Sequence, residues 1–270
     1  MKRLNGRVAV VTGAASGIGR ATALELARRG CALALADVDA DRLAATQQAV
    51  EDCGTRATVH VADVADARRM AELPDEVANQ HGSCSILVNN AGVLSVGRFS
   101  DDQIDDINWI VGINVFGVIH GCYYFLPLLR ASEEAHIVNV SSMAAFAGIP
   151  QNAIYSLTKG AVRSFTEALR AELVGTSIGV SALFPGAVGT NIMDRARGAQ
   201  AKRLAEFGRS WFAPLLRRPP EAAARQIVRA IEHNRARVLL GPDARALDVV
   251  ARILPGRTRL LGRALDLIPS

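Results

Sequence analysis

The sequence lacks several features that would assign it to a specialised class. Cysteine is scarce and forms no Cys-x-x-Cys pair, so the spacing argues against a zinc site and favours free thiols in a reducing compartment. The cysteines are Cys31, Cys53, Cys84 and Cys122. We expect no apolar run that approaches the roughly 20 residues needed to span a bilayer. The chain passes from Met1, Lys2 and Arg3 into an apolar run too short for a signal-peptide core. These absences predict a cytoplasmic protein.

Aromatic residues are also few, at 5% of the chain, whereas half of the residues are apolar. Ala, Val, Leu, Ile and Gly dominate, which is typical of a buried parallel sheet covered by helices. A chain of 270 residues can form one large α/β domain or two small ones. No repeat, low-complexity segment or linker divides it, so we expect a single domain over residues 1–270.

The net charge of +5 is unevenly distributed. Residues 1–190 carry 15 basic and 19 acidic side chains, and residues 191–270 carry 16 basic and 7 acidic ones. Solvated helix faces are the simpler explanation of the basic region. The alternative is attraction to an anionic substrate, an acidic carrier or a membrane surface. The basic residues form no recognisable nucleic-acid-binding motif, so no nucleic-acid partner is expected.

Apolar runs alternate with stretches of helical spacing. The runs that predict strands are 8–11, 31–36, 57–61, 86–88, 136–140, 178–184 and 238–240. The stretches that predict helices are 18–29, 41–53, 67–80, 102–129 with a bend near Gly117 or Gly121, and 153–174. Strands that alternate with helices indicate βαβ units. We therefore predict a doubly wound, Rossmann-type parallel sheet of about seven strands with helices on both faces.

The residue types that commonly carry function gather where these strands end. They are Gly13, Asp37, Asp63, Asn89, Ser142 and Pro185. In doubly wound sheets, ligands bind outside the carboxyl ends of the strands. The sequence therefore predicts a ligand site at one edge of the sheet.

The stretch 12–19, Thr-Gly-Ala-Ala-Ser-Gly-Ile-Gly, follows the first strand and opens the first helix. Glycines there permit a tight turn and let backbone N–H groups approach a pyrophosphate, to which the helix N-terminus adds positive potential. No Gly-Lys-Ser/Thr follows, so the stretch is not the loop of a nucleoside triphosphatase.

Asp37 stands 18 residues after Gly19, at the end of the second strand. An acidic side chain there can accept hydrogen bonds from both ribose hydroxyls of a dinucleotide, and it would repel a 2′-phosphate. Ser16 and Val38 supply no cation for such a phosphate, so NAD is favoured over NADP. A helix N-cap is the alternative role for Asp37.

Tyr155 and Lys159 lie four residues apart in a helical stretch, so both project from one face. An ammonium near a phenol favours the phenolate and lowers a pKa that is otherwise about 10. Such a tyrosine can donate or accept a proton. The pair alone is also compatible with two exposed helix residues.

With Thr-Gly-x-x-x-Gly-x-Gly, Asn-Asn-Ala-Gly at 89–92, Ser142 and Tyr-x-x-x-Lys in this order, the chain resembles the short-chain dehydrogenases/reductases over about residues 6–190. The resemblance implies hydride transfer between a secondary alcohol and a nicotinamide, without a metal. It implies a catalytic tetrad of Asn114, Ser142, Tyr155 and Lys159. The cofactor-binding residues that it implies are Gly13, Ser16, Gly17, Ile18, Gly19, Asp37, Asp63, Val64, Asn90, Ala91, Gly92, Tyr155, Lys159, Pro185, Gly186, Val188 and Thr190.

In this resemblance Tyr155 is the general acid or base, and Lys159 lowers its pKa and binds the nicotinamide ribose. Ser142, 13 residues before Tyr155, orients and stabilises the substrate oxygen. Asn114 supports a water that connects Lys159 to solvent. Taken singly, Asn114 could be a helix-interior polar group, Ser142 part of a strand-end turn and Thr190 a helix cap.

Residues 186–218 follow the sixth strand at the same sheet edge and are expected to form a substrate-binding loop and helices. Apolar side chains there and upstream predict a pocket for a lipophilic alcohol or ketone, such as a steroid, a retinoid-like molecule or an acyl chain. Ordinary core packing is an equal explanation for half of them. The candidates are Leu94, Val96, Phe99, Met143, Phe146, Ile149, Ile192, Met193, Leu204, Phe207, Trp211, Phe212 and Leu215.

The C-terminal stretch 243–270 mixes basic and aliphatic residues, and Pro255 and Gly256 interrupt it. It could cover the pocket, pack on a neighbouring subunit or lie on a membrane surface. The family resemblance implies a homodimer or homotetramer. Two other functions stay open: an NADPH-dependent 3-oxoacyl reductase for carrier- or CoA-linked chains, and a non-catalytic dinucleotide sensor. Such a sensor would be expected to lack Tyr155 or Lys159.

Overall fold

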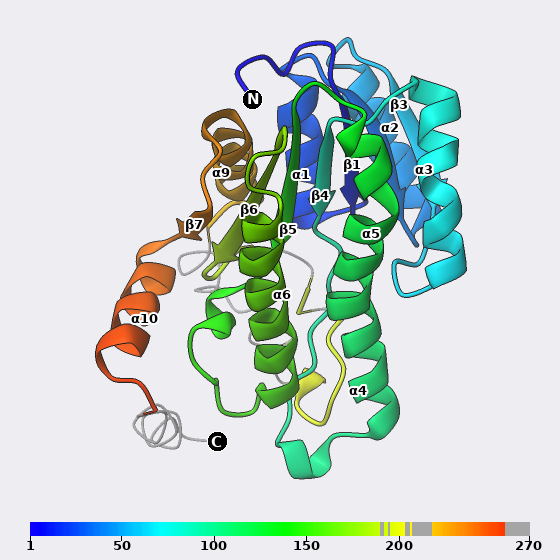
Figure 1. The fold of residues 1–270 in the computed structure, drawn as a ribbon. Helices are drawn as coiled ribbons and strands as arrows, with labels where there is room; N and C mark the ends of the chain where they lie inside the picture. The colour runs from blue at the N-terminus through cyan, green and yellow to red at the C-terminus, as the bar shows by residue number, and fades with distance from the viewer. Residues whose placement is uncertain (190–191, 194, 203–205, 207–217, 257–270) are drawn as a thin grey trace.

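A parallel sheet of seven strands, in the order β3-β2-β1-β4-β5-β6-β7, forms the centre of the molecule (Figure 1). The computed structural model describes residues 1–189, 192–193, 195–202, 206 and 218–256. The chain adds strands outward from β1 to β3 and then returns to the other side of β1 with β4. The point between β1 and β4, where this order reverses, is the switch point at which doubly wound sheets bind ligands. The predicted fold class is confirmed.

The strands follow the apolar runs of the sequence to within one or two residues. They are β1 (Val8–Thr12), β2 (Ala32–Asp37), β3 (Ala57–Val61), β4 (Ile86–Asn89), β5 (Ala135–Val140), β6 (Ile178–Pro185) and β7 (Arg237–Leu240). Strands β1, β4 and β5 are buried along their whole length. Because helices cover both faces, these strands are buried on both sides and are mostly apolar rather than alternating.

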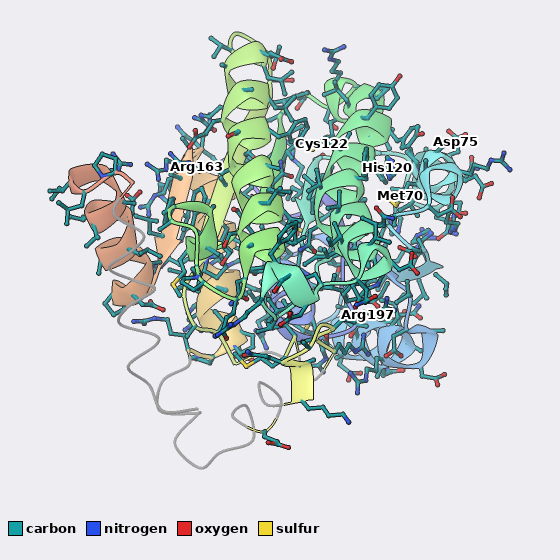
Figure 2. All side chains as sticks on the ribbon, turned by 90° about the horizontal axis from the view of Figure 1, so that it is seen from below. Met70, Asp75, His120, Cys122, Arg163 and Arg197 are labelled. Carbon is teal, nitrogen blue, oxygen red and sulfur yellow. The ribbon has the colours of Figure 1, made fainter. Side chains whose placement is uncertain are left out.

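The helices form a layer on each face of the sheet (Figure 1). They are α1 (Gly17–Ala27), α2 (Ala40–Glu51), α3 (Ala67–His81), α4 (Ile104–Val111), α5 (Gly117–Arg130), α6 (Ala153–Glu172), α9 (Pro220–His233) and α10 (Pro242–Ile253), with short helical turns η1 (Phe99–Asp101), η2 (Gly112–Phe116) and η3 (Met143–Ala145). One buried cluster joins the sheet to α1, α2 and α9, and a second joins it to α3, α5 and α6. Figure 2 shows α6, α5 and α3 side by side, marked by Arg163, Cys122 and Met70.

Elements α4, η2 and α5 form one continuous helical stretch, Ile104–Arg130, as the sequence predicts. Its irregular turn, η2, is a π-helix that ends directly before Gly117. By length and a mean hydropathy of 1.5 this helix could span a membrane, because residues 107–129 carry no charged side chain. The expectation that the chain contains no such segment is therefore wrong. The evidence for a span is weak, because a core helix passes the same test, and Phe125 and Leu129 are buried against the sheet.

The C-terminal region is more regular than the sequence analysis expects. Residues 242–253, treated there largely as part of a tail, form α10, which begins with Pro242 in its first turn. Helix α9 was not predicted, although it also begins with a proline, Pro220, and ends at Asn234 in the left-handed conformation. Residues 257–270 of the proposed tail lie outside the described residues.

Candidate active site

A cleft of about 450 Å³ runs along the carboxyl edge of the sheet. Of the residues named from the sequence, it is lined by Gly13, Ser16, Gly17, Ile18, Asp37, Asp63, Val64, Asn90, Ala91, Gly92, Leu94, Val96, Ser142, Met143, Ile149, Tyr155, Lys159, Pro185, Gly186, Val188, Ile192 and Met193. The structure adds Val38, Ala62, Val93, Ile113, Val140, Ser141, Ala144, Asn152, Ala187 and Arg195. One edge of the sheet therefore gathers residues from six strand ends.

The glycine turn between β1 and α1 is fixed from the neighbouring strand. Gly13 adopts a left-handed φ of 65°, and the Asn90 side-chain amide donates to the carbonyls of Thr12 at 2.9 Å and Gly13 at 3.2 Å. Gly19 lies beneath the turn rather than in the cleft lining. A Cβ atom at Gly19 would lie 2.1 Å from the Gly13 carbonyl oxygen, so no side chain fits there. The turn thus presents backbone at close range to the cleft.

Asp37 is held at the end of β2 by two backbone N–H groups. Ala15 donates to Oδ2 at 3.0 Å and Asp39 donates to Oδ1 at 3.1 Å. Asp39, not Asp37, is the N-cap of α2 and accepts from the Arg42 backbone. The alternative role of Asp37 as a helix cap is therefore wrong. Its carboxylate faces the cleft while tied to the glycine turn.

Arg195 reaches across the mouth of the cleft to the end of β2. Its Nη2 lies 2.7 Å from Oδ2 of Asp39, 156 residues away in sequence. Hydrogen bonds from the Arg42 backbone and the Arg195 side chain hold the pKa of Asp39 below its ordinary value. Arg197, labelled in Figure 2, anchors the same segment at the other side through Asp106 at 3.3 Å. Its guanidinium also lies 4.1 Å from the centre of the Trp109 ring.

The side chains of Asp63 and Val64, which the family resemblance places beside an adenine, lie at the same end as Asp37. Oδ1 of Asp63 accepts from the Ala65 backbone at 2.9 Å, and the Val64 carbonyl lies 2.9 Å from Nδ1 of His120 on α5. The loop after β3 is therefore fixed both internally and from α5.

Ser142, Tyr155 and Lys159 meet where η3 and α6 border the cleft. Ser142 is the N-cap of η3, and its hydroxyl hydrogen-bonds Tyr155. Lys159 is only 4% exposed, and its Nζ donates to the Val140 carbonyl at 3.1 Å and lies 5.9 Å from the centre of the Tyr155 ring. Ser141 points away and donates to the Lys159 carbonyl at 2.8 Å. The strand-end serines thus separate into one that faces Tyr155 and one that braces α6.

Burial dominates the protonation of this pair. Burial raises the pKa of Tyr155 above its usual 10.0, and the Ser142 hydrogen bond offsets the rise in part. Burial lowers the pKa of Lys159 from 10.5 to about 8. Burial and the Ser142 hydrogen bond are thus the two causes that shift the Tyr155 pKa here, and a lowering of that pKa by Lys159 stays a prediction.

Asn114 is fully buried behind the cleft, in the π-turn η2. Its side chain exchanges two hydrogen bonds with the Val93 backbone, at 2.8 and 2.9 Å, and donates to Thr158 at 3.1 Å. It therefore ties the loop after β4 to the helix that carries Tyr155 and Lys159. The sequence identifies the residue, but not this link to α6.

The segment after β6 forms the wall opposite the glycine turn. Pro185, Gly186 and Val188 line the cleft, and the Ala187 backbone donates to Oδ2 of Asp243 at 2.7 Å. Asp243, near the start of α10, thus fixes this wall from the C-terminal region. No motif in the sequence pointed to it. Thr190 lies outside the described residues.

The substrate end is lined by apolar side chains, but not by all those predicted. Phe146 is absent from the cleft lining and packs instead on Phe184 at 4.7 Å between ring centres, with Arg237 5.4 Å from its ring. Phe99 is 64% exposed and does not line the cleft either. The prediction for Phe146 is wrong because its ring packs on Phe184 instead, and the prediction for Phe99 is wrong because its side chain faces solvent. Trp211, with Leu204, Phe207, Phe212 and Leu215, lies outside the described residues.

Comparison with known proteins agrees with this arrangement. A family model described as short chain dehydrogenase matches residues 7–201. The chain belongs to the short-chain dehydrogenase family. An oxidoreductase of Mycobacterium tuberculosis, SadH, is 37% identical over 256 residues, which cover 94% of this chain and 93% of the relative.

Two solved structures of this family were determined with NAD. A short-chain dehydrogenase/reductase from Burkholderia phymatum in complex with NAD superposes with a TM-score of 0.86 at 33% identity, covering 97% of both chains. A short-chain dehydrogenase from Mycobacterium paratuberculosis bound to NAD has a TM-score of 0.79 at 26% identity, covering 90% of this chain and 98% of that one. The likeness thus extends beyond the residues that the family model matches.

Proposed function

We propose that this protein is an NAD-dependent oxidoreductase that interconverts a secondary alcohol and a ketone. The observation that carries the proposal is the meeting of Ser142, Tyr155 and Lys159 at one end of a cleft whose other end holds the glycine turn and Asp37. Similarity to dehydrogenases that were solved with NAD supports the choice of cofactor.

The glycine turn fits a dinucleotide. The backbone at Gly13 and Gly17 is left-handed, and α1 begins at the turn, so N–H groups and the helix N-terminus face the position of a pyrophosphate. Asp37 would accept from the adenosine ribose hydroxyls, and Asp63 and Val64 would border the adenine. When bound, the nicotinamide accepts or donates the hydride and, in its oxidised form, carries a positive charge.

Tyr155 moves the hydroxyl proton in this reaction. In ketone reduction the Tyr155 phenol, which lines the cleft, donates its proton to the carbonyl oxygen as that oxygen gains negative charge. Ser142 orients the same oxygen through its hydroxyl. Lys159 binds the nicotinamide ribose, and Asn114 supports a water that passes protons between Lys159 and solvent. The π-turn around Asn114 opens the local helix backbone for that water.

The NADPH-dependent rival requires a cation beside the 2′-position of the adenosine ribose. Of the described lining residues, Arg195 is the cation near that end, and Asp39 already neutralises it at 2.7 Å. With Asp37 beside it, this end of the cleft favours the free hydroxyls of NAD.

The apolar wall formed by Leu94, Met143, Ile149 and Ile192 supports a lipophilic substrate of the steroid-like or acyl-chain kind. The family also supports a homodimer or homotetramer, and Tyr123 and Phe116 leave aromatic surface exposed on the helical stretch Ile104–Arg130. A membrane contact through the C-terminal stretch remains a proposal of lower rank.

The test is the reduction of a panel of lipophilic ketones by NADH, which is monitored through the loss of NADH absorbance. Wild type is expected to reduce at least one member, and Tyr155→Phe is expected to lose about 10²- to 10⁴-fold in kcat while its NADH affinity is unchanged. Activity that survives Tyr155→Phe would contradict the assignment. Tight NADH binding without turnover of any ketone or alcohol would favour the non-catalytic sensor.

A further inference from the structure

Asn152 is a polar side chain at the substrate end of the cleft that the proposed mechanism does not use. It lines the cleft near Met143 and Ile149, and it lies at the N-cap of α6, three residues before Tyr155. Asn152 and Tyr155 both line the cleft, so the Asn152 amide borders the space that a substrate bound at Tyr155 would occupy.

Asn152 does not do what asparagine usually does at an N-cap. Such a side chain normally accepts from a backbone N–H of the first turn, and Asn152 makes no such hydrogen bond. Its Nδ2 donates to the Pro150 carbonyl at 3.4 Å, which is long for a hydrogen bond. No described residue donates a hydrogen bond to its Oδ1. Most of its hydrogen-bonding capacity is therefore available to a ligand.

The backbone holds Asn152 at this place. Gln151 before it has a left-handed φ of 63°, uncommon for a residue with a side chain, and its carbonyl accepts from the Gly97 backbone at 2.9 Å. Ser156, one turn into α6, is already engaged by the Ile149 backbone at 3.3 Å. Asn152 is thus the polar group of this stretch that remains available to a part of the substrate other than the reacting oxygen.

Its neighbours in the cleft are apolar, notably Leu94, Val96 and Ile149. An amide among them disfavours a purely hydrocarbon substrate, because binding would strip water from the amide without replacing its hydrogen bonds. A site built to bond a substrate oxygen instead discriminates against the analogue that lacks it. The amide can donate or accept, so it can pair with a hydroxyl or a carbonyl.

We infer that Asn152 is a specificity-determining residue that selects lipophilic alcohols and ketones with a second hydrogen-bonding oxygen a few bonds from the reacting carbon. This inference rests on the proposed function. It narrows the substrate class from any lipophilic secondary alcohol to a difunctional one, such as a diol or a hydroxyketone.

The test compares oxidation of 2-octanol with that of octane-2,3-diol, octane-2,4-diol and octane-2,5-diol. In wild type, at least one diol is expected to exceed 2-octanol about 3- to 10-fold in kcat/KM, mainly through KM. Asn152→Leu is expected to abolish that advantage, with kcat/KM for 2-octanol rising or falling less than kcat/KM for the diol. Asn152→Ser, which places a hydroxyl where the amide was and is a good N-cap, is expected to retain part of that advantage.

Ile149→Ala is the matched control, because it removes an apolar contact and should lower kcat/KM for diol and 2-octanol by similar factors. Binding of the same alcohols to the enzyme–NADH complex is measured through cofactor fluorescence. It gives the affinity for a diol relative to 2-octanol even where a variant has lost turnover. Equal wild-type constants for 2-octanol and every diol, or a diol preference that survives Asn152→Leu, would overturn the inference but leave the dehydrogenase function standing. Failure of wild type to bind NADH or oxidise any of these alcohols would instead overturn the proposed function, and the inference with it.

Discussion

The two ends of the cleft present different groups to a ligand. At the nucleotide end, backbone groups around Gly13 and the carboxylate of Asp37 are fixed by hydrogen bonds that link β1, β2 and β4. At the substrate end, the described part of the wall consists of apolar side chains such as Met143 and Ile149, with the amide of Asn152 among them. One end is thus defined by backbone geometry and the other by side-chain shape.

The difference determines how much change each end tolerates. A backbone turn that leaves no room for a Cβ atom fails when one atom is added, whereas an apolar wall accepts exchanges of similar volume. The nucleotide end can therefore stay constant while the substrate end varies, which is how one fold supports many substrates.

Of the substitutions considered, Gly19→Ala should have the largest effect on cofactor binding at the nucleotide end. The added Cβ would lie 2.1 Å from the Gly13 carbonyl oxygen and 2.5 Å from the Asn90 amide, so the turn must shift. We expect NADH binding to weaken by about 10- to 100-fold, as measured by fluorescence titration. Gly148→Ala is the control, because nothing lies within 4 Å of its added Cβ. Equal, small effects of both substitutions would mean that the turn does not contact the cofactor.

Lys159→Met is expected to lower the activity of the enzyme while raising its free energy of unfolding. The folded-state pKa of Lys159, about 8, lies below the unfolded value of 10.5, so burial opposes folding fully below pH 8 and ceases to do so as the pH rises through 10.5. The variant should lose activity, yet gain about 1–3 kcal/mol in unfolding free energy at pH 7.

Urea unfolding at pH 7 and at about pH 10.5 checks this expectation, because the gain should shrink at the higher pH. Lys2→Met, at an exposed position, should leave the free energy of unfolding unchanged at both pH values. Destabilisation of Lys159→Met by the same amount at both pH values would show that its bond to the Val140 carbonyl outweighs the burial penalty.

The contact between Arg195 and Asp39 joins the substrate segment to the nucleotide end, and its effect should be the smallest. Arg195 is exposed enough for solvent to screen the pair. Stopped-flow displacement should show NADH leaving Arg195→Ala about two- to fivefold faster than wild type. The difference should vanish at high salt. Arg28→Ala, which loses only a surface pair with Glu25, should match wild type. A salt-independent difference would assign Arg195 a packing role instead.

The sequence predicts the nucleotide end well because its chemistry is local. Glycine spacing, a strand-terminal Asp37 and the seven apolar runs each lie within a short stretch, and the order of motifs identifies the family. The bounds of all seven strands follow the apolar runs closely, most directly for β1, β4 and β5, which are buried along their whole length.

The substrate end is less predictable because side chains distant in sequence decide it. Phe146 looked like a pocket residue but packs on Phe184, and Asp243 acts on the Ala187 backbone from 56 residues away. Burial likewise raises the Tyr155 pKa, which sequence spacing could not indicate. Asn152 was overlooked because a single asparagine before a helix resembles an ordinary cap.

The most direct test of the account is a fluorescence titration of NADH against NADPH on wild type and on Asp37→Ala. The account predicts that wild type binds NADH more tightly than NADPH and that Asp37→Ala loses this preference, because the carboxylate that accepts from the ribose hydroxyls is gone. Tighter binding of NADPH by wild type would contradict the assignment of the nucleotide end and would favour the carrier- or CoA-linked 3-oxoacyl reductase.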